Sequence, residues 1–445
     1  MSNLADHPDV PRVRVVVVNH NGGERTLDSL AALERTDWPP DRLDLVLVDN
    51  ASTDGIAARL EREHPRVQLI RSERNLGFAG GANLGLRRRD GVDHVALVNP
   101  DAFVRPGWLS PLVGKLAQDH GVGAACPKIL LTGRYAELGI DSPTRRRGRG
   151  DRRSLGVRLT GVTVAGRDVL AHTRFVSGTW GPEPGGRWTN GRARLRVPAD
   201  DSSPPVTGAV RLDAEAPLTV TTQSGGQVGR HEVGREPAWY PFELADASVA
   251  LINNIGNVLV ADGYGADRGW LEPDDGGFDD PVDVFAWCGG AVLLRGTYLD
   301  DVGIFDERLF LYCEDLELSW RGRERGWRYH TVPSSIVDHE HAATAIEGSA
   351  LSDHYNQRNH LLVVTRHAPI RTVARVWVRY LAVTASYARR DVLSHWLRGA
   401  RGSGELVGRR LRAFAGALRR VPIMLGARWR DARRRRNADR GHPSG

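Results

Sequence analysis

Two acidic segments of this sequence have the residue types and surroundings of catalytic carboxylates. The apolar run Val95–Val98 leads into Asp101, and the segment Phe310–Cys313 leads into Glu314 and Asp315. A carboxylate at the end of a strand can hold a divalent metal ion at the edge of a parallel sheet. A carboxylate at the start of a helix can place a general base at the same edge. Together the two segments predict catalysis at a metal-bound phosphate.

The first segment has the character of a metal site. Asp101 follows Asn99 and Pro100, and Pro100 keeps the preceding backbone extended and ends the strand. Mg²⁺ or Mn²⁺ takes one or two carboxylates and completes its shell with substrate phosphate and water. Such an ion would neutralise a diphosphate leaving group, and His339 or His341 could complete its shell. The alternatives are a turn role for Asp101 and structural roles for the two histidines.

The second segment offers a base. Glu314 and Asp315 begin a helical pattern, and Asp315 could accept the proton of an acceptor hydroxyl. The alternative is that both carboxylates only complement the positive end of the helix dipole, as acidic residues do at many helix N-termini.

Two further loops could bind a nucleotide. Asp49, beside Asn50 and Ser52, follows the apolar run 44–48, and could accept hydrogen bonds from a nucleobase or a ribose. The alternative is that this segment caps the helix predicted at 56–63. The glycine-rich segment 75–85 would let backbone NH groups approach a phosphate at a helix N-terminus, although it equally suits a tight turn.

The first third of the chain alternates strand and helix patterns that would position these loops. Apolar β-branched runs predict strands, and apolar residues at helical spacing predict helices between them. Strands are expected at 13–18, 44–48, 67–70 and 95–98, and helices at 24–34 and 56–63. This alternation predicts a doubly wound parallel sheet, in which ligands bind at the carboxyl ends of the strands. A further strand is expected at Trp287–Leu294, before the Glu-Asp helix.

The pattern changes near Asp141. Short alternating segments separated by Gly, Pro, Asp and Ser predict an antiparallel, sandwich-like β unit inserted into one α/β domain. The expected divisions are 1–141 and 251–365 for the two parts of the α/β domain, 142–250 for the β insert, and 366–445 for a basic helical tail with a disordered end. Trp180, Trp188 and Trp239 of the insert could stack on sugar rings, although core packing is the favoured interpretation.

Charge is distributed unevenly along the chain. The net charge is +7, yet the chain from Arg371 onward holds 19 Arg and 4 acidic residues, a net of +15, which leaves −8 for the rest. A basic amphipathic tail favours an anionic membrane surface, where each Arg contributes about 1 kcal/mol. Nucleic acid is disfavoured as a partner, because the body is acidic and has no recognition motif.

Composition favours an intracellular location. Cys126, Cys288 and Cys313 are far apart and have no metal-ligand spacing, which fits a reducing compartment. The N-terminal residues lack the pattern of a signal peptide, and no uncharged apolar run approaches the roughly 20 residues of a membrane span. The expected location is the cytoplasm, peripheral at the inner face of the cell membrane.

These segments, in this order, resemble the family 2 inverting glycosyltransferases of the GT-A fold, particularly the rhamnosyltransferase-like branch. The resemblance covers about 1–141 and 251–365. It is carried by the following segments: Val18–Gly22, Val48–Gly55, Asn75–Gly85, Asn99–Ala102, Gly303–Arg308, Tyr312–Arg321 and Gly326–Trp327. Arg358-Asn359 also resembles a late Arg-Asn pair of the family, for which the sequence suggests no role.

The resemblance implies a role for each matching residue. Asp315, with Glu314 beside it, would deprotonate the acceptor, and Asp101 with His339 would hold Mg²⁺ or Mn²⁺. The donor would contact Asn19, Asn21, Asp49, Asn50, Ser52, Asn75, Gly80, Asn83 and Asn99. Trp287, Gly289, Gly290 and Ala291 would shape the acceptor pocket. Asn-Pro-Asp at 99–101 departs from the family's Asp-X-Asp, so one expected metal ligand is neutral and strict metal dependence is open.

The implied activity is sugar transfer with inversion. A hexosyltransferase would move the sugar of a nucleotide-diphosphate donor, dTDP-rhamnose or alternatively a UDP-sugar, to a cell-surface glycan or lipid-linked acceptor. The alternative is a non-catalytic membrane-surface scaffold that keeps the sugar-nucleotide fold. The sequence identifies neither the linkage nor the oligomeric state.

Overall fold

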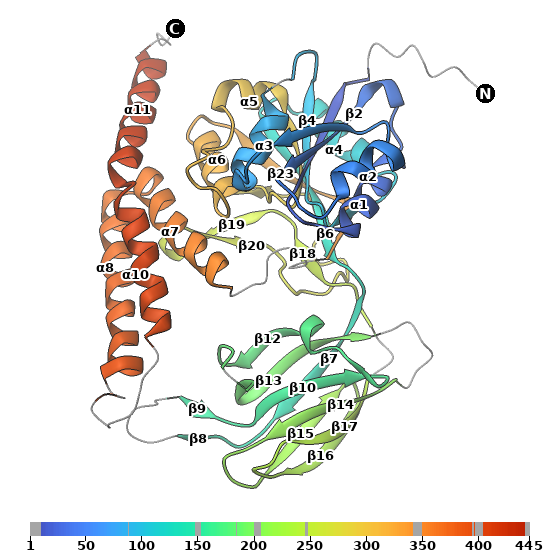
Figure 1. The fold of residues 1–445 in the computed structure, drawn as a ribbon, viewed down its shortest axis with the longest axis vertical. Helices are drawn as coiled ribbons and strands as arrows, with labels where there is room; N and C mark the ends of the chain where they lie inside the picture. The colour runs from blue at the N-terminus through green and yellow to red at the C-terminus, as the bar shows by residue number, and fades with distance from the viewer. Residues whose placement is uncertain are drawn as a thin grey trace, which may run out of the picture. The chain divides into compact units, whose positions relative to one another are not determined.

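The computed structural model describes residues 10–87, 89–146, 153–183, 185–199, 206–244, 248–340, 349–393, 396 and 404–440, with side chains described up to residue 433. The chain divides into two compact units (Figure 1). The α/β unit comprises residues 1–130, 253–269 and 278–445. The β unit comprises residues 131–252 and 270–277.

A mixed sheet of ten strands forms the centre of the α/β unit. Its main path runs β21-β23-β6-β22-β4-β1-β2-β3, with β18 beside β6 and β5 beside β23. The strands are β1 Val13–Asn19, β2 Leu43–Asn50, β3 Gln68–Ser72, β4 His94–Val98, β5 Ala102–Val104, β6 Val122–Leu131, β18 Ile252–Asn254, β21 Asp283–Val284, β22 Ala291–Arg295 and β23 Arg328–His339. The four strands β4, β1, β2 and β3 are parallel.

The parallel part confirms the predicted strands of the first third of the chain, and the rest of the sheet is mixed. β22 runs antiparallel to β4, with Ala291 opposite Val98. The strand expected at Trp287–Leu294 begins only at Ala291, because Gly289 and Gly290 form a turn before it. This turn reaches the edge of the sheet where β4 ends.

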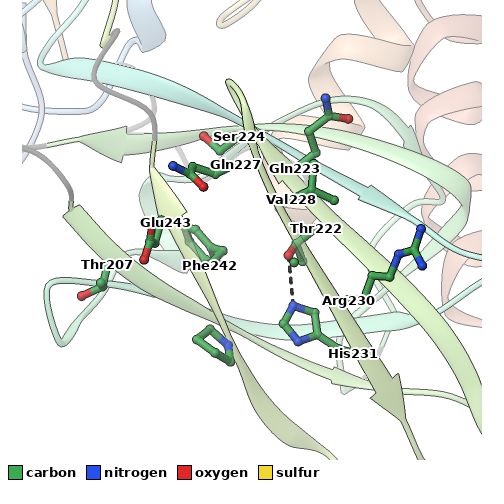
Figure 2. Close-up of a pocket in the computed structure, with 12 residues that line it drawn as sticks. Thr207, Thr222, Gln223, Ser224, Gln227, Val228, Arg230, His231, Phe242 and Glu243 are labelled. Carbon is green, nitrogen blue, oxygen red and sulfur yellow. Dashed lines mark hydrogen bonds between the residues drawn. The ribbon is translucent and has the colours of Figure 1, made fainter.

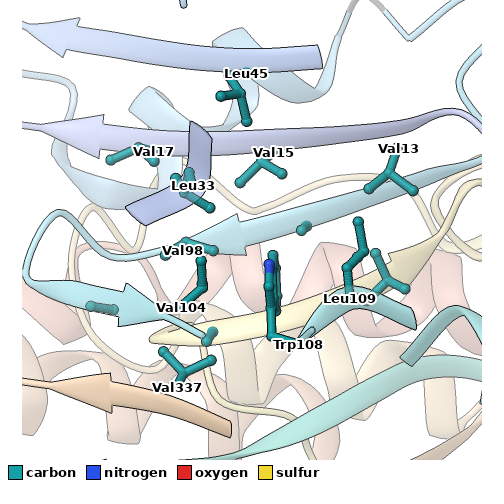
Figure 3. Close-up of a cluster of buried hydrophobic side chains, with 14 of the residues drawn as sticks. Val13, Val15, Val17, Leu33, Leu45, Val98, Val104, Trp108, Leu109 and Val337 are labelled. Atoms are coloured by element: carbon teal, nitrogen blue, oxygen red, sulfur yellow. The ribbon is translucent and has the colours of Figure 1, made fainter. Parts of the chain in front are cut away.

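Helices cover both faces of the sheet because successive strand residues point to opposite sides. Val13, Val15 and Val17 of β1 pack under one helical layer (Figure 3). Val16 and Val18 pack under the other. The first layer consists of α1 Glu24–Glu34, α2 Ile56–Glu63 and α4 Leu109–Gln118. The second consists of α3 Gly77–Leu86, α5 Gly296–Val302 and α6 Glu314–Arg323. The valine-rich β1 is thus buried on both sides, as expected for a central strand.

The C-terminal part of the α/β unit is helical, as predicted. Its helices share a buried cluster that includes Leu361, Val376, Ala417 and Met424. They are α7 Ala350–His367, α8 Ile370–Tyr387, α10 Glu405–Leu418 and α11 Val421–Arg440. No helix in the described part of the chain is both long and apolar enough to span a membrane. The disordered end expected after α11 falls on residues outside the described ones.

The β unit is antiparallel, as predicted for the insert. Nine strands form one sheet with the path β16-β15-β7-β13-β10-β14-β17, and β11 and β12 pair at its side. They are β7 Arg134–Asp141, β10 Arg158–Val164, β11 Arg167–Asp168, β12 Arg174–Thr179, β13 Arg187–Ala199, β14 Val206–Asp213, β15 Leu218–Ser224, β16 Gln227–Val233 and β17 Ala238–Leu244. β8 Arg145–Arg146 and β9 Ser154–Leu155 form a separate small pair.

The three tryptophans of the β unit differ in environment. Trp188 is buried, which agrees with core packing, and the Arg158 guanidinium lies over its ring. Trp180 is partly buried and donates from Nε1 to the Ser154 carbonyl oxygen at 3.0 Å. Trp239 is 49% exposed, so core packing is wrong for this residue.

Candidate active site

The carboxyl ends of the parallel strands bring polar residues to one edge of the sheet. Asn19 and Asp49 stand opposite each other where β1 and β2 end. Asn99 directly follows β4, and its backbone NH donates to the Gly290 carbonyl oxygen at 2.9 Å. The turn at Gly289 and Gly290 therefore joins the same edge, where ligands bind in sheets of this type.

A cavity of about 500 Å³ opens at this edge. Three of the predicted donor residues line it: Asn50, Asn75 and Asn99. The sequence did not identify the other side chains that line it: His20, Phe78, Phe310, Leu311, Tyr312, Ser349, Leu351 and Ser352, with Val18 and Pro100. His20 could have been found from its place in the loop after the first strand. No local signal marks Phe310–Tyr312 or Ser349–Ser352.

Asn50 holds the glycine-rich loop against the end of β2. Its Nδ2 donates to the Gly77 carbonyl oxygen at 3.0 Å and to Asn75 Oδ1 at 3.1 Å, and its Oδ1 accepts from the Leu76 NH at 2.9 Å. Gly77 has a φ of +70°, and a Cβ there would lie 2.2 Å from the Phe310 carbonyl oxygen. The loop is therefore fixed in position, and Gly77 is required for the close approach of segment 310.

Four predicted donor residues bind one another across the ends of β1 and β2. Asn19 Nδ2 donates to Ser52 Oγ at 3.1 Å, and Asn21 Oδ1 accepts from the Thr53 NH at 2.7 Å. Asp49 Oδ1 accepts from the Ser52 NH at 2.9 Å. The first two contacts join the two loops to each other, and none of the three caps α2, whose N-cap is Gly55. Whether Asp49 binds a nucleotide stays a prediction.

Asp54, two residues before α2, contacts the start of that helix. Its Oδ1 accepts from the Ile56 NH at 3.2 Å at the start of α2.

Four predicted site residues lie in the packed interior. Trp287 is fully buried against Phe305, and Ala291 is buried within β22. Asn83 is buried. Its Nδ2 donates to the Phe305 carbonyl oxygen at 3.0 Å, and its Oδ1 accepts from the Phe305 NH at 3.1 Å. Gly80 lies within α3, close to Leu76. None of these four lines the cavity at the sheet edge.

Asp315 stands at the start of α6 and is not among the residues that line this cavity. Its Oδ2 accepts from the Gly289 NH at 3.1 Å, and its Oδ1 from the Leu316 NH at 2.7 Å. A Cβ on Gly289 would stand 3.6 Å from the Phe78 ring and 3.8 Å from Asp315 Cβ. Because Phe78 lines the cavity, Gly289 connects the acidic helix to it. Asp315 keeps part of its side chain accessible.

The neighbouring carboxyls differ in their partners. Burial raises the pKa of Glu314 well above its usual range, and the Asp315 charge raises it further. Its Oε2 is buried and has no hydrogen-bond partner. Burial also raises the pKa of Asp315, but the Gly289 and Leu316 NH groups favour its ionised form. Asp315 therefore ionises first, while Glu314 stays protonated longer.

Arg358 and Asn359 of α7 bind the loop that leads into α6. Asn359 Nδ2 donates to the carbonyl oxygens of Leu309, Leu311 and Tyr312 at 2.7 to 2.8 Å. Arg358 Nη2 donates to the carbonyl oxygens of Arg308 and Leu309, at 3.0 and 2.7 Å. Burial lowers the pKa of Arg358 to about 10. The Arg-Asn pair thus has a structural role that the sequence could not supply.

The predicted metal residues meet in the structure. His339 Nε2 lies 3.1 Å from Asp101 Oδ1, and His339 Nδ1 lies 2.6 Å from Asn253 Oδ1. Both Asp101 and His339 are buried.

A divalent cation fits this donor set. One carboxylate and one imidazole suit Mn²⁺ or Mg²⁺ when phosphate and water complete the shell. No cluster of three or more His, Cys, Asp or Glu side chains suited to a metal occurs in the described ranges, which exclude His341.

The comparisons with known proteins agree with this architecture. Residues 14–167 match the model of Glycosyl transferase family 2. The N-acetylglucosaminyl-diphospho-decaprenol L-rhamnosyltransferases of Mycobacterium tuberculosis strains CDC 1551 / Oshkosh and H37Rv are each 35% identical to this chain over 97 residues. This segment is 20% of the chain, and the chain spans about a third (31%) of the length of these curated relatives.

Solved structures give more distant likenesses. GalNAc-T7 with UDP, GalNAc and Mn²⁺ is 14% identical with a TM-score of 0.45, over 81% of this chain and 48% of that one. The mannosyltransferase PcManGT of Pyrobaculum calidifontis, in complex with GDP-Man and Mn²⁺, is 14% identical with a TM-score of 0.41, over 92% and 87%.

The family match covers β1 to β4, whose carboxyl ends form the candidate site, and the motif residues after these strands occupy the same sheet edge. Residues 14–167 match glycosyltransferase family 2, and the α/β unit has a GT-A-like fold.

Proposed function

We propose that this protein is an inverting glycosyltransferase in which Asp315 is the catalytic base. The observation that carries the proposal is the contact of the Asp315 carboxylate with the NH of Gly289, which adjoins Phe78 in the wall of the 500 Å³ cavity. In direct displacement the acceptor hydroxyl attacks the anomeric carbon, its proton passes to the base, and the nucleoside diphosphate leaves. One base and no covalent intermediate give inversion.

The electrostatics of the two carboxyls support this assignment. A base must be ionised, and Asp315 has two NH partners that stabilise its negative charge. Glu314, buried without a partner for Oε2, is the group that retains a proton. Its protonated form leaves Asp315 free of a neighbouring negative charge.

The cavity suits a nucleotide sugar. Asn50, Asn75 and Asn99 supply amide groups, and Phe78 and Tyr312 supply aromatic surface. Asp101 and His339 would hold a Mg²⁺ or Mn²⁺ ion, which when bound would neutralise charge on the leaving diphosphate.

The names of the relatives support a choice of donor and acceptor. The 35% identical proteins carry a name that specifies L-rhamnosyl transfer to N-acetylglucosaminyl-diphospho-decaprenol. This supports dTDP-rhamnose as the donor, ahead of a UDP-sugar, and a lipid-linked glycan of the cell envelope as the acceptor.

Donor binding and turnover test the proposal separately. Purified full-length protein is screened by thermal shift against dTDP-rhamnose and UDP-sugars, with and without Mn²⁺. The best donor is then assayed for release of the nucleoside diphosphate. Asp315→Asn should keep the thermal shift and lose turnover by about 10³-fold, the range of a missing general base. Asp301→Asn, an exposed change on α5, is the control.

Turnover retained by Asp315→Asn would exclude Asp315 as the base, and absence of any donor shift would favour a non-catalytic scaffold.

The C-terminal helices support peripheral attachment to an anionic membrane at the inner face of the cell membrane. Most exposed large apolar side chains of the described residues lie after residue 369. Those on the helices are Ile370, Val378 and Leu381 of α8, Leu411 and Leu418 of α10, and Ile423, Leu425 and Trp429 of α11. Arginines stand among them, at Arg371, Arg412, Arg419 and Arg430. Exposed apolar groups among cationic side chains are the pattern of an interfacial helix.

Liposome sedimentation tests this attachment. The wild type should sediment with phosphatidylglycerol vesicles and not with phosphatidylcholine vesicles. Val378→Ser with Trp429→Ser should release it without loss of donor binding, whereas Trp239→Ser, a change of an exposed tryptophan in the β unit, should not. Equal binding to both lipids, or no effect of the double variant, would contradict a membrane role for this surface.

A further inference from the structure

The β unit contains a second cavity, at the seam between two edge strands. β16 and β17 are the two ends of the strand path and have no ladder between them in the described residues. Near the turn that joins them, the Tyr240 hydroxyl donates to the Glu232 carbonyl oxygen at 3.2 Å, and its ring lies 5.4 Å from that of His231. Farther from the turn, a cavity of about 520 Å³ lies between β15 and β16 on one side and β14 and β17 on the other (Figure 2).

The inward side of the sheet changes from apolar to polar at this cavity. In a curled sheet, alternate residues of each strand share the interior. From the centre outward, the inward positions are Val220, Thr222 and Ser224 on β15, and Val233, His231 and Gly229 on β16. Val220 and Val233 belong to the apolar core of the β unit, whereas Thr222 and His231 line the cavity. Polar inward positions are costly unless a partner or a ligand satisfies them.

The polar interior is ordered by direct contacts. His231 Nε2 lies 3.0 Å from the Thr222 hydroxyl (Figure 2). A Cβ on Gly229 would stand 2.7 Å from that hydroxyl and 2.9 Å from Nε2. A glycine therefore leaves room for the Thr222–His231 pair and keeps the mouth of the curled sheet open. The mouth of such a barrel-like sheet is a common place for a ligand.

The rim provides hydrogen-bonding groups of balanced charge. Gln223, Gln227, Arg230 and Glu243 line the cavity and are exposed. Two amides, one guanidinium and one carboxylate give many donors and acceptors with no excess charge. A phosphate or nucleotide would need excess positive charge here. Phe242, beside the rim, offers an apolar surface suited to the CH face of a sugar ring.

We propose that this mouth of the β unit binds a neutral saccharide. The hydroxyl, imidazole and amide groups match a ligand that carries many hydroxyls, and the cavity volume lies within the usual range of about 300 to 1,000 Å³ for small-molecule sites. The site is separate from the sheet edge of the α/β unit, and the proposal does not depend on transfer activity.

Saccharide binding by the full-length protein, without nucleotide, tests the proposal. The probe is an array of neutral di- and trisaccharides of hexoses, 6-deoxyhexoses and N-acetylhexosamines, followed by calorimetry on the ligands that bind. The double variant Gln227→Ala with Glu243→Ala changes only exposed rim residues, and it should weaken binding at least tenfold. Glu236→Ala, on the turn between β16 and β17 and outside the cavity, should leave binding unchanged.

A second pair of variants separates this site from other surfaces. Asp315→Asn should retain saccharide binding, even if it abolishes transfer. Trp239→Ala should also retain binding, because Trp239 does not line the cavity. The proposal is overturned if no neutral saccharide binds, if the rim double variant binds as the wild type does, or if binding is lost with Asp315→Asn or Trp239→Ala. Failure of transfer with intact rim-dependent binding would count only against the proposed function.

Discussion

The Asn359 side-chain nitrogen lies 2.7 Å from the Tyr312 carbonyl oxygen, three residues before Asp315. The loop that it binds has an unusual backbone, because Phe310, Tyr312 and Cys313 have φ values of +66°, +67° and +65°. Such left-handed residues cost roughly 1–2 kcal/mol each when they are not glycine. The buried amide of Asn359 therefore holds a conformation that the loop would not keep alone, and with it the start of α6.

Asn359→Ala tests whether this contact positions the base. The change removes hydrogen bonds to three carbonyl groups, so we expect kcat to fall by about 10²-fold, as for a displacement of catalytic groups by about 1 Å. Loss of the Gly289 NH contact would also move the acid limb of the pH–rate profile to higher pH, because that NH favours ionised Asp315. Steady-state kinetics from pH 5 to 9 would measure both effects.

The matched control is Asn356→Ala, one turn earlier on α7. Asn356 is exposed, and its Nδ2 donates to Ser352 Oγ at 3.4 Å. This control should keep both kcat and the pH profile. A folded Asn359→Ala protein with an unchanged acid limb would indicate that Asn359 supports the fold without positioning Asp315.

Glu314 is expected to limit stability at neutral and alkaline pH. Burial, and then Asp315, raise its pKa in the folded protein. Near pH 4 it is protonated in the folded and unfolded states alike, and it costs little. As the pH rises above the ordinary pKa of about 4.3, Glu314 ionises more readily in the unfolded state than in the folded state. The free energy of unfolding therefore falls. The loss is about 1.4 kcal/mol for each pH unit between the unfolded-state pKa and the folded-state pKa.

Glu314→Gln should remove this cost. The variant should equal the wild type near pH 4 and exceed it in free energy of unfolding at pH 7 to 8, measured by urea denaturation at both pH values. A variant that is less stable at pH 8 would show that a charged Glu314 has an unrecognised partner.

The sequence predicted the elements whose causes are local. The runs at Val15–Val18 and Val95–Val98 are buried on both faces, and their continuous apolar character identified them as central strands. The polar residues after them were correctly expected at one sheet edge. The turn at Gly289 and Gly290 was missed because the apolar residues around it resemble a longer strand.

The contacts that complete the site could not be predicted, since they join distant segments through backbone atoms. Asn359 bonds the carbonyl oxygens of residues about 50 positions earlier, and carbonyl groups carry no sequence signal. The positive φ angles of Tyr312 and Cys313 likewise have no residue-type marker, because glycine is absent there. Trp239 is exposed despite its type, because only the strand register decides which face it occupies.

Removal of the Asp101 carboxylate should make the binding of the metal ion independent of the binding of the nucleotide. If Asp101 and His339 hold a divalent ion that also binds diphosphate, Mn²⁺ and dTDP together should raise Tm by more than the sum of their separate effects. Asp101→Asn should abolish this additional rise in Tm, so that the two separate effects simply add. The control is Asp338→Asn. Asp338 is next to His339 in the sequence, and its carboxylate pairs with Arg105 at 3.0 Å. An excess retained by Asp101→Asn, or absent from the wild type, would count against a metal at these residues.

Arg366 is expected to anchor the helix that carries Asp315. It is buried and lies 2.6 Å from Glu317 of α6, 2.9 Å from Asp431 of α11 and 3.3 Å from Asp306. Burial alone would raise the pKa of Glu317, but Arg321 and Arg366 hold it far below its usual range. Breaking a buried ion pair costs about 3–5 kcal/mol because a charge is left without its partner.

Arg366→Leu should therefore lower the free energy of unfolding by about that amount at pH 7, whereas Arg371→Leu, at an exposed position on α8, should change it little. Because the pKa of Glu317 is depressed in the folded state, its contribution is present above the unfolded value of about 4.3 and is lost as the pH falls further. The difference between wild type and Arg366→Leu should narrow in urea titrations below pH 4. A penalty that is equal at pH 7 and pH 3 would show that Arg366 acts through packing and not through the Glu317 charge.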